Sequence, residues 1–261
     1  MKIIKTNSLV SVTASSTNPS YPVSNLYSNT SPKKKWKAAN AAVTMASFSV
    51  AVAPGSDGIG MTGIVAESAT VKISNPSGIT WENVTWGNVS WDPGTPDVVI
   101  DSTYIQEQGR DFASLWASFP QFDSIVNITI ELRKSTGNPN VLAAGVLVAG
   151  EMVSFPDPFS PLAEGINDYS ITRELSNGAF YHRERDRVRT FAGEIGIDRA
   201  QYFYQFMRDF ARTYGQTPVM ALIAEGIGDE FIIYGRLAGM PSGSHINRNR
   251  SAISFNLIEV I

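Results

Sequence analysis

The sequence predicts a mainly β protein with two domains: an N-terminal β-sandwich and a C-terminal β-sandwich or sheet that carries one α-helix. Two observations lead to this prediction. Short runs in which apolar and polar residues alternate recur between clusters of Gly, Pro, Asn and Ser. Only one long stretch, in the second half, has the apolar spacing of a helix. With 43% hydrophobic and 17% charged residues, the 261-residue chain can build such cores.

Alternating strands dominate the first part. The runs are SLVSVTAS, TMASFSVAV, TGIVAE, TVKIS, DVVID and IVNITIELR. In the last of them Ile128, Ile130 and Leu132 share one face, while polar residues occupy the other. This is the pattern of a half-buried strand in an antiparallel sheet, and strands at this spacing without long helices between them predict a β-sandwich.

The predicted domain boundary separates residues 1–155 from residues 156–261. The first part holds eight lysines and two arginines, whereas the second holds eleven arginines and no lysine. This change in composition falls beside FPDPFSPL at 155–162, whose three prolines are expected to interrupt regular structure.

One helix is predicted in the second part, within IDRAQYFYQFMRDFARTYG. Asp198 is a suitable N-cap, and Gly215 suits the position just after the last turn. The apolar stripe of this helix consists of Phe203, Phe206, Met207, Phe210 and Tyr214. The strands predicted from TPVMALIA, EFIIYGRL and AISFNLIEV supply a sheet on which that stripe can dock.

Three tryptophans lie five residues apart in TWENVTWGNVSWD. On a strand, this spacing sends Trp86 to the face opposite Trp81 and Trp91, so the three indoles cannot form one flat platform for a sugar. Packing in a core is the favoured interpretation. A protein interface and a sugar-binding site at these residues remain alternatives.

An alternating run of arginines, YHRERDRVRTF, is the second candidate site. On a continuous strand, Arg183, Arg185, Arg187 and Arg189 share one face. They form either a solvated face whose arginines pair with nearby acids, or an interface that binds carboxylates of an adjacent subunit. The pattern alone does not separate these two interpretations.

Several classes of function are excluded on composition. The chain has no cysteine, only the histidines His182 and His245, no Gly-rich phosphate loop and no G-x-S-x-G motif. We therefore expect no enzymatic activity, no catalytic residue, no cofactor and no metal. The net charge of −3 argues against nucleic acid as a partner. Without a signal-peptide pattern or a long apolar run, a soluble protein without membrane insertion is expected.

The N-terminal part resembles galactose-binding-like (discoidin-type) β-sandwiches, which have a jelly-roll-like fold. The resemblance implies that a tryptophan packs beneath the first strands and that IVNITIELRKSTGNPNVLAAGVLVAGEMVSF forms a closing hairpin. The matching residues near the start are Ala14, Ser15, Ser16, Tyr21, Pro22, Asn25, Leu26 and Trp36.

Residues 165–261 resemble the portion that follows such a module in tail-tip proteins of long-tailed bacteriophages. A β-sandwich with one helix is similar to the ring-forming domain of distal tail proteins. The matching residues are Asp168, Ser170, Arg173, Gly178, Tyr181, Thr217, Pro218, Tyr234, Gly235 and the closing SFNLIEV.

This resemblance implies a structural virion protein of a tail tip or baseplate, made in the host bacterial cytoplasm. Its partners would be other tail proteins (tail tube, hub and tape measure) and copies of itself in a homo-oligomeric ring. Distal tail proteins place the ring domain first, whereas this chain reverses the order, so ring subunit and adaptor both remain open. The alternative function is a carbohydrate-binding module that recognises host surface glycans.

Overall fold

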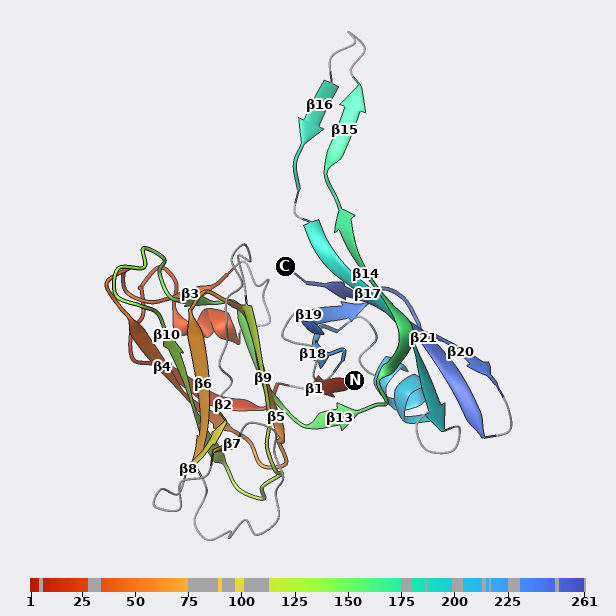
Figure 1. Cartoon of the computed structure of the whole chain (residues 1–261), viewed down its shortest axis with the longest axis horizontal. Helices are drawn as coiled ribbons and strands as arrows, with labels where there is room; N and C mark the ends of the chain where they lie inside the picture. The colour runs from red at the N-terminus through yellow and green to blue at the C-terminus, as the bar shows by residue number, and fades with distance from the viewer. Residues whose placement is uncertain are drawn as a thin grey trace.

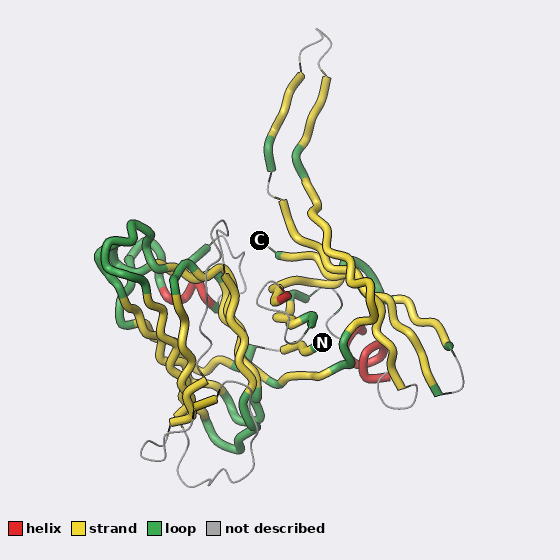
Figure 2. The backbone as a smooth tube through the Cα atoms, in the orientation of Figure 1, coloured by secondary structure: helices red, strands yellow, loops and turns green. Residues whose placement is uncertain are grey.

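The computed structural model describes residues 1–4, 7–27, 34–74, 89–90, 97–100, 113–174, 180–185, 187–198, 204–212, 215, 217–224, 231–246 and 249–260. Within these ranges the chain is almost entirely β-strand, with one short 3-10 helix and one π-helix (Figure 2). Every strand pairing is antiparallel. The predicted mainly β fold is therefore confirmed.

The N-terminal β-sandwich has one large and one small principal sheet. The large sheet is ordered β2 (Leu9–Ala14), β4 (Met45–Val52), β10 (Val126–Arg133), β6 (Ser68–Ser74), β8 (Asp97–Ile100) and β7 (Val89–Ser90). The small sheet is ordered β12 (Val146–Gly150), β5 (Gly58–Ile64) and β9 (Ala113–Ser118). A further pair joins β3 (Trp36–Lys37) to β11 (Ala143–Ala144), beside the 3-10 helix η1 (Val23–Leu26).

The core of this sandwich follows the alternation in the sequence. On β10, Ile128, Ile130 and Leu132 are buried, as predicted, while the residues between them are exposed or half-buried. Apolar side chains from the two principal sheets meet in one cluster, which includes Phe48 of β4 and Met61 of β5. Alternation therefore decides which side of each strand enters the core.

Trp36 is fully buried in this core, as the resemblance implies. Its ring packs edge-on against Phe48, with the two ring centroids 4.5 Å apart. The indole Nε1–H donates to Thr17 Oγ1 at 3.2 Å, which satisfies the one polar atom of the side chain. Trp36 thus joins β3 and the segment of Thr17 to β4 of the large sheet.

The C-terminal half is built on an eight-stranded sheet. Its order is β13 (Met152–Ser154), β1 (Lys2–Ile4), β18 (Val219–Leu222), β19 (Ile232–Leu237), β21 (Arg250–Glu259), β17 (Arg187–Asp198) and β14 (Pro158–Asp168), with β20 (Ser242–His245) pairing with β21. The strands predicted around TPVMALIA, EFIIYGRL and AISFNLIEV are present as β18, β19 and β21.

Two strands of this sheet, β1 and β13, come from the predicted first domain, residues 1–155. β1 lies between β13 and β18, with Ile3 opposite both Val153 and Ala221. The amino group of Met1 donates to the Phe155 carbonyl at 2.9 Å. The division into residues 1–155 and 156–261 therefore remains a prediction, and the first strand of the chain pairs with the second half.

A third apolar cluster joins the sandwich to the C-terminal sheet. On β12, Leu147 and Ala149 enter the sandwich core, whereas Val146 and Val148 pack with residues of β1, β18 and β19. The strands approach closely here, because a Cβ on Gly60 would lie 2.6 Å from Met220 Cγ. The small sheet is thus covered on both faces, which explains the continuous apolar sequence VLAAGVLVAG.

FPDPFSPL interrupts regular structure only in its first three residues, 155–157, which separate β13 from β14. β14 begins at Pro158 and continues through Pro161, with a shift in its pairing to β17 between Phe159 and Ala163. β14 lies at the edge of the sheet order, where a proline without an N–H need not break a ladder hydrogen bond. The irregularity is therefore absorbed at the edge of the sheet.

The predicted helix is present among the described residues and has π-type turns. Helix η2 spans Tyr204–Ala211, and its buried Phe206 packs against Phe155 with ring centroids 4.9 Å apart. Asp198 is not its N-cap, because this residue ends β17 opposite Arg250. Pairing between β17 and β21 continues through Asp198, so this residue is part of a strand and not a helix cap. Gly215 N–H donates to the Ala211 carbonyl at 3.0 Å, which closes the last turn.

Candidate functional site

A projecting β-ribbon is the candidate functional site. The ribbon formed by β14 and β17 extends out of the C-terminal sheet. Between these two strands in the sequence lie β15 (Ile171–Glu174) and β16 (Phe180–Arg183), which form a separate two-stranded sheet (Figure 1). We call residues 169–185 the arm. In Figure 1 the arm extends away from both halves of the protein. An isolated two-stranded ribbon is marginally stable in water, so contacts at its base or with a partner are needed to hold it.

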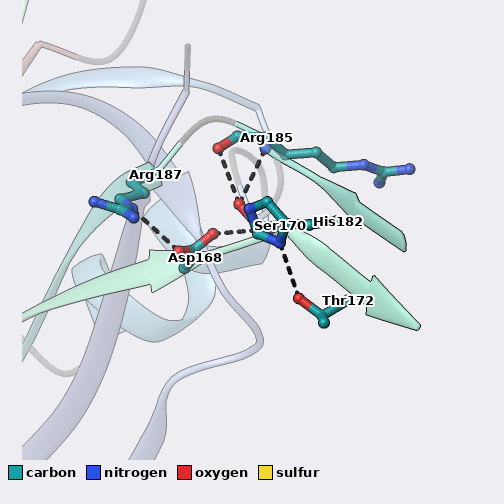
Figure 3. A network of polar contacts seen from close by, with 6 residues as sticks. All are labelled: Asp168, Ser170, Thr172, His182, Arg185 and Arg187. Atoms are coloured by element: carbon teal, nitrogen blue, oxygen red, sulfur yellow. Dashed lines mark hydrogen bonds and ion pairs between the residues drawn. The ribbon is translucent and has the colours of Figure 1, made fainter. Parts of the chain in front are cut away.

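Polar contacts connect the two segments of the ribbon where the arm begins (Figure 3). Both strands are interrupted here, between β14 and β15 and between β16 and β17. Ser170 Oγ accepts from the Arg185 backbone N–H at 3.0 Å and lies 3.4 Å from the Arg185 carbonyl. Arg187 Nε donates to Asp168 Oδ2 at 3.0 Å. These contacts replace the ladder hydrogen bonds that the interruption removes.

The carboxylate of Asp168 carries a negative charge at the start of the arm. Hydrogen bonds from Ser170, and next the guanidinium of Arg187, lower the pKa of Asp168 from 3.8 to about 2. Its Oδ1 accepts the Ser170 backbone N–H at 2.8 Å, the geometry of an Asx turn. The D-x-S part of the motif in the sequence thus forms the turn from which the arm starts.

Replacing Ser170 by Ala is expected to raise the pKa of Asp168 towards 3.8, because the side-chain contact that contributes most is lost. The backbone N–H and Arg187 remain, so the pKa stays below that value. A folded-state pKa below the unfolded one means that Asp168 stabilises the fold above the unfolded pKa and loses this effect as the pH falls towards about 2. In Ser170→Ala the loss occurs at a higher pH. Carboxyl NMR titration measures the shift, and Thr172→Ala is the control with no expected change.

The four arginines predicted to share one strand face do not lie on one strand. β16 ends at Arg183 and β17 begins at Arg187, with Arg185 in the interruption between them. Arg187 pairs with Asp168, and Arg189 Nη2 lies 3.3 Å from Glu259 Oε1 and donates to the Ile232 carbonyl at 3.3 Å. The continuous four-residue stripe is therefore wrong in geometry. Two of its arginines are occupied within the chain, and the interface role of the set remains a prediction.

The two faces of the arm differ in chemistry. Directly opposed residues of an antiparallel pair share a face. Ile171 lies opposite Arg183 and Arg173 lies opposite Tyr181, so these four side chains occupy one face, which we call the arginine–tyrosine face.

The other face carries the pairs Thr172–His182 and Glu174–Phe180. Thr172 Oγ1 and His182 Nδ1 are 2.9 Å apart, so this histidine has a partner on its own face. The single described carboxylate on the paired strands, Glu174, is thereby on the side opposite Arg173 and Arg183.

Large side chains of the arm are exposed to solvent. Phe180 is 72% exposed and Tyr181 48% exposed. Near the base, Ile166 and Tyr169 are exposed as well. Phe180 and Tyr181 lie on opposite faces, so each face of the arm presents one exposed ring. Exposed aromatic side chains are enriched at surfaces that another protein covers.

The sequence did not identify Arg173 and Tyr181 as one surface with Arg183. Arg173 lies ten residues before Arg183 and joins it only through the register of the hairpin. The signal available in the sequence was two short alternating runs around LSNGA, whose Asn-Gly favours a turn.

Other predicted site residues contribute no described constellation. Trp81, Trp86 and Trp91 lie outside the described residues. In the described ranges, no three side chains of His, Asp or Glu gather in a group that could hold a metal ion. Likewise, none of the helices that the structure describes is long and apolar enough to span a bilayer.

Comparisons with known proteins give only distant structural likenesses. No family model matches the sequence, and no curated protein sequence matches it. A chain of "reduced XRCC1 bound to DNA pol beta catalytic domain" aligns with a TM-score of 0.39 and 12% identity, covering 57% of this chain and 98% of that one.

Chitosan-binding module 1 of a chitosanase/glucanase from Paenibacillus sp. IK-5 aligns in its selenomethionine-labelled form with a TM-score of 0.37 and 16% identity, covering 56% of this chain and 98% of the module. A second structure of that module gives a TM-score of 0.34 and 14% identity, covering 56% and 96%. At these TM-scores the likenesses assign no function to the chain.

Proposed function

We propose that the protein is a non-enzymatic structural subunit of the tail tip or baseplate of a long-tailed bacteriophage. It assembles there as a ring or adaptor subunit with other tail proteins. The observation that carries the proposal is the arm, a projecting ribbon with exposed Phe180 and Tyr181. A ribbon of this kind suits contact with a neighbouring subunit better than a role in an isolated monomer.

The sequence resemblance supports the same proposal. Asp168 and Ser170 of the tail-tip motif form the turn that starts the arm, and Arg173 and Tyr181 of the same motif lie on one of its faces. Four of the residues that match the family pattern thus lie in the arm or at its start, and others lie on β19 and β21 of the C-terminal sheet.

The test is to purify the protein and measure its mass by native mass spectrometry, alone and after mixing with tail-tube, hub and tape-measure proteins. We expect a stable complex with at least one of these components. Glycan-array binding measured in parallel should stay at background. Absence of any tail complex together with reproducible glycan binding would replace the proposal with the carbohydrate-binding alternative.

A further inference from the structure

We infer that the arginine–tyrosine face of the arm docks onto an acidic surface of a second copy of this chain. The inference rests on the proposed function and identifies both the docking face and its occupant. The face consists of Ile171, Arg173, Tyr181 and Arg183, which the hairpin register places together.

The charges on this face have no partner within the described chain. Arg173 and Arg183 are exposed and, among the described residues, neither forms an ion pair. Arg187 and Arg189, by contrast, are paired with Asp168 and Glu259. Two arginines that flank a tyrosine form a surface with forked donors and a flat apolar centre, a composition enriched at protein interfaces.

Charge complementarity points to a second copy as the occupant. The arm, residues 169–185, has three arginines and two glutamates and therefore a formal charge of +1. Because the whole chain has −3, the remainder has −4. That remainder exposes a carboxylate on each face of the C-terminal sheet, because Glu164 shares a face with Phe191 and Glu194 lies on the other. Neither is in an ion pair with another described residue.

The position of the arm makes this contact intermolecular. β15 and β16 extend away from the body of the protein (Figure 1), so the arginine–tyrosine face that they carry lies apart from the carboxylates of its own sheet. An arm that docks onto the body of the next copy uses two different surfaces. Such a head-to-tail contact generates a ring when the rotation between copies closes.

Nucleic acid is the competing occupant for an arginine-rich face. The negative charge of the remaining chain opposes it, because a phosphate backbone would be repelled beyond the immediate contact. Glu174 on the opposite face of the ribbon and Glu184 at its base add to that repulsion.

The experiment compares the self-association of three full-length proteins by native mass spectrometry and sedimentation velocity. They are the unmodified chain, the arm variant Arg173→Glu/Arg183→Glu, and the control Lys34→Glu/Arg212→Glu, which makes the same charge change at exposed positions off the arm. We expect the unmodified chain and the control to associate. The arm variant should associate about 100-fold more weakly or remain monomeric, because like charges then face each other. Circular dichroism and thermal unfolding verify that all three proteins are folded.

Three results would overturn the inference. Equal association of the arm variant and the unmodified chain would show that this face is not used. A monomeric unmodified chain at all concentrations would exclude a second copy as the occupant. Binding of a single-stranded oligonucleotide that is lost in the arm variant would assign the face to nucleic acid. A monomeric chain that still binds tail components would leave the proposed function standing, so the two failures are distinguishable.

Discussion

Trp36→Ala is expected to lower the free energy of unfolding by about 3–5 kcal/mol, the range for truncating a buried aromatic side chain. The side chain has no exposed surface, packs edge-on against Phe48 and leaves Thr17 without its donor when it is removed. A cavity beside Phe48, where the indole of Trp36 packs, would remain. Urea denaturation followed by tryptophan fluorescence and circular dichroism measures the loss.

Two variants give this measurement its controls. Trp36→Phe keeps an aromatic ring against Phe48 and should lose clearly less than the alanine variant. Tyr27→Ala removes an exposed aromatic side chain from the same segment and should change stability by less than about 0.5 kcal/mol. If Trp36→Ala lost no more than Tyr27→Ala, Trp36 could not be a core residue of the sandwich.

The sequence predicts the strands that have one buried and one solvent-facing side, such as β4 and β10. Alternation in β10 names Ile128, Ile130 and Leu132 as core residues, and all three are buried. The same reasoning finds β18, β19 and β21, where apolar runs are bounded by turn residues. Such signals are local, so they survive without knowledge of the partner strand.

What the sequence does not predict depends on pairing between distant segments. The N-terminal strand β1 pairs with β13 and β18, and no local pattern in MKII names those partners. Asp198 has the composition of a helix cap, yet its place opposite Arg250 extends the sheet instead. In each case long-range pairing outweighs a local preference.

The candidate site follows the same division. Alternation in YHRERDRVRTF indicates a strand, and β16 and β17 are strands, but the pattern does not show the interruption between them. Arg187 and Arg189 pair with acids of the same chain, as one of the two interpretations expects, but the pattern does not identify Asp168 and Glu259 as the partners. The face shared by Arg173, Tyr181 and Arg183 exists only through the hairpin register. A pattern along one strand cannot predict a surface that two paired strands form together.

A buried lysine secures the turn that closes the sandwich. Lys134 is 7% exposed, and its Nζ donates to the carbonyls of Ala41, Asn138 and Asn140 at 2.5, 2.9 and 2.5 Å. All three donors of the ammonium are thereby used. The ammonium thus connects the segment before β4 to the turn at residues 137–139, which follows β10.

Glu67 holds the same turn from outside. Its carboxylate accepts from Asn138 Nδ2 at 2.6 Å and from Ser135 N–H at 2.6 Å, and these hydrogen bonds hold the pKa of Glu67 below its ordinary value. The turn also needs Gly137, whose φ of +97° is a conformation that other residues rarely adopt. Lys134 therefore stabilises this turn by hydrogen bonds from its buried side, and Glu67 stabilises it by hydrogen bonds from its exposed side.

Lys134→Met is expected to lower the free energy of unfolding by about 3 kcal/mol or more, because three carbonyl oxygens lose a charged donor and a hydrogen bond to a charged group contributes about 1.5–3 kcal/mol. Methionine keeps the length and apolar stem of lysine, so the loss reports on the ammonium and not on a cavity. The matched control is Lys72→Met on β6, which removes a partly exposed ion pair with Glu131 and should cost less than about 1 kcal/mol. Urea denaturation measures both variants. Equal, small losses would mean that the turn is held without the ammonium, and the fastening role of Lys134 would have to be abandoned.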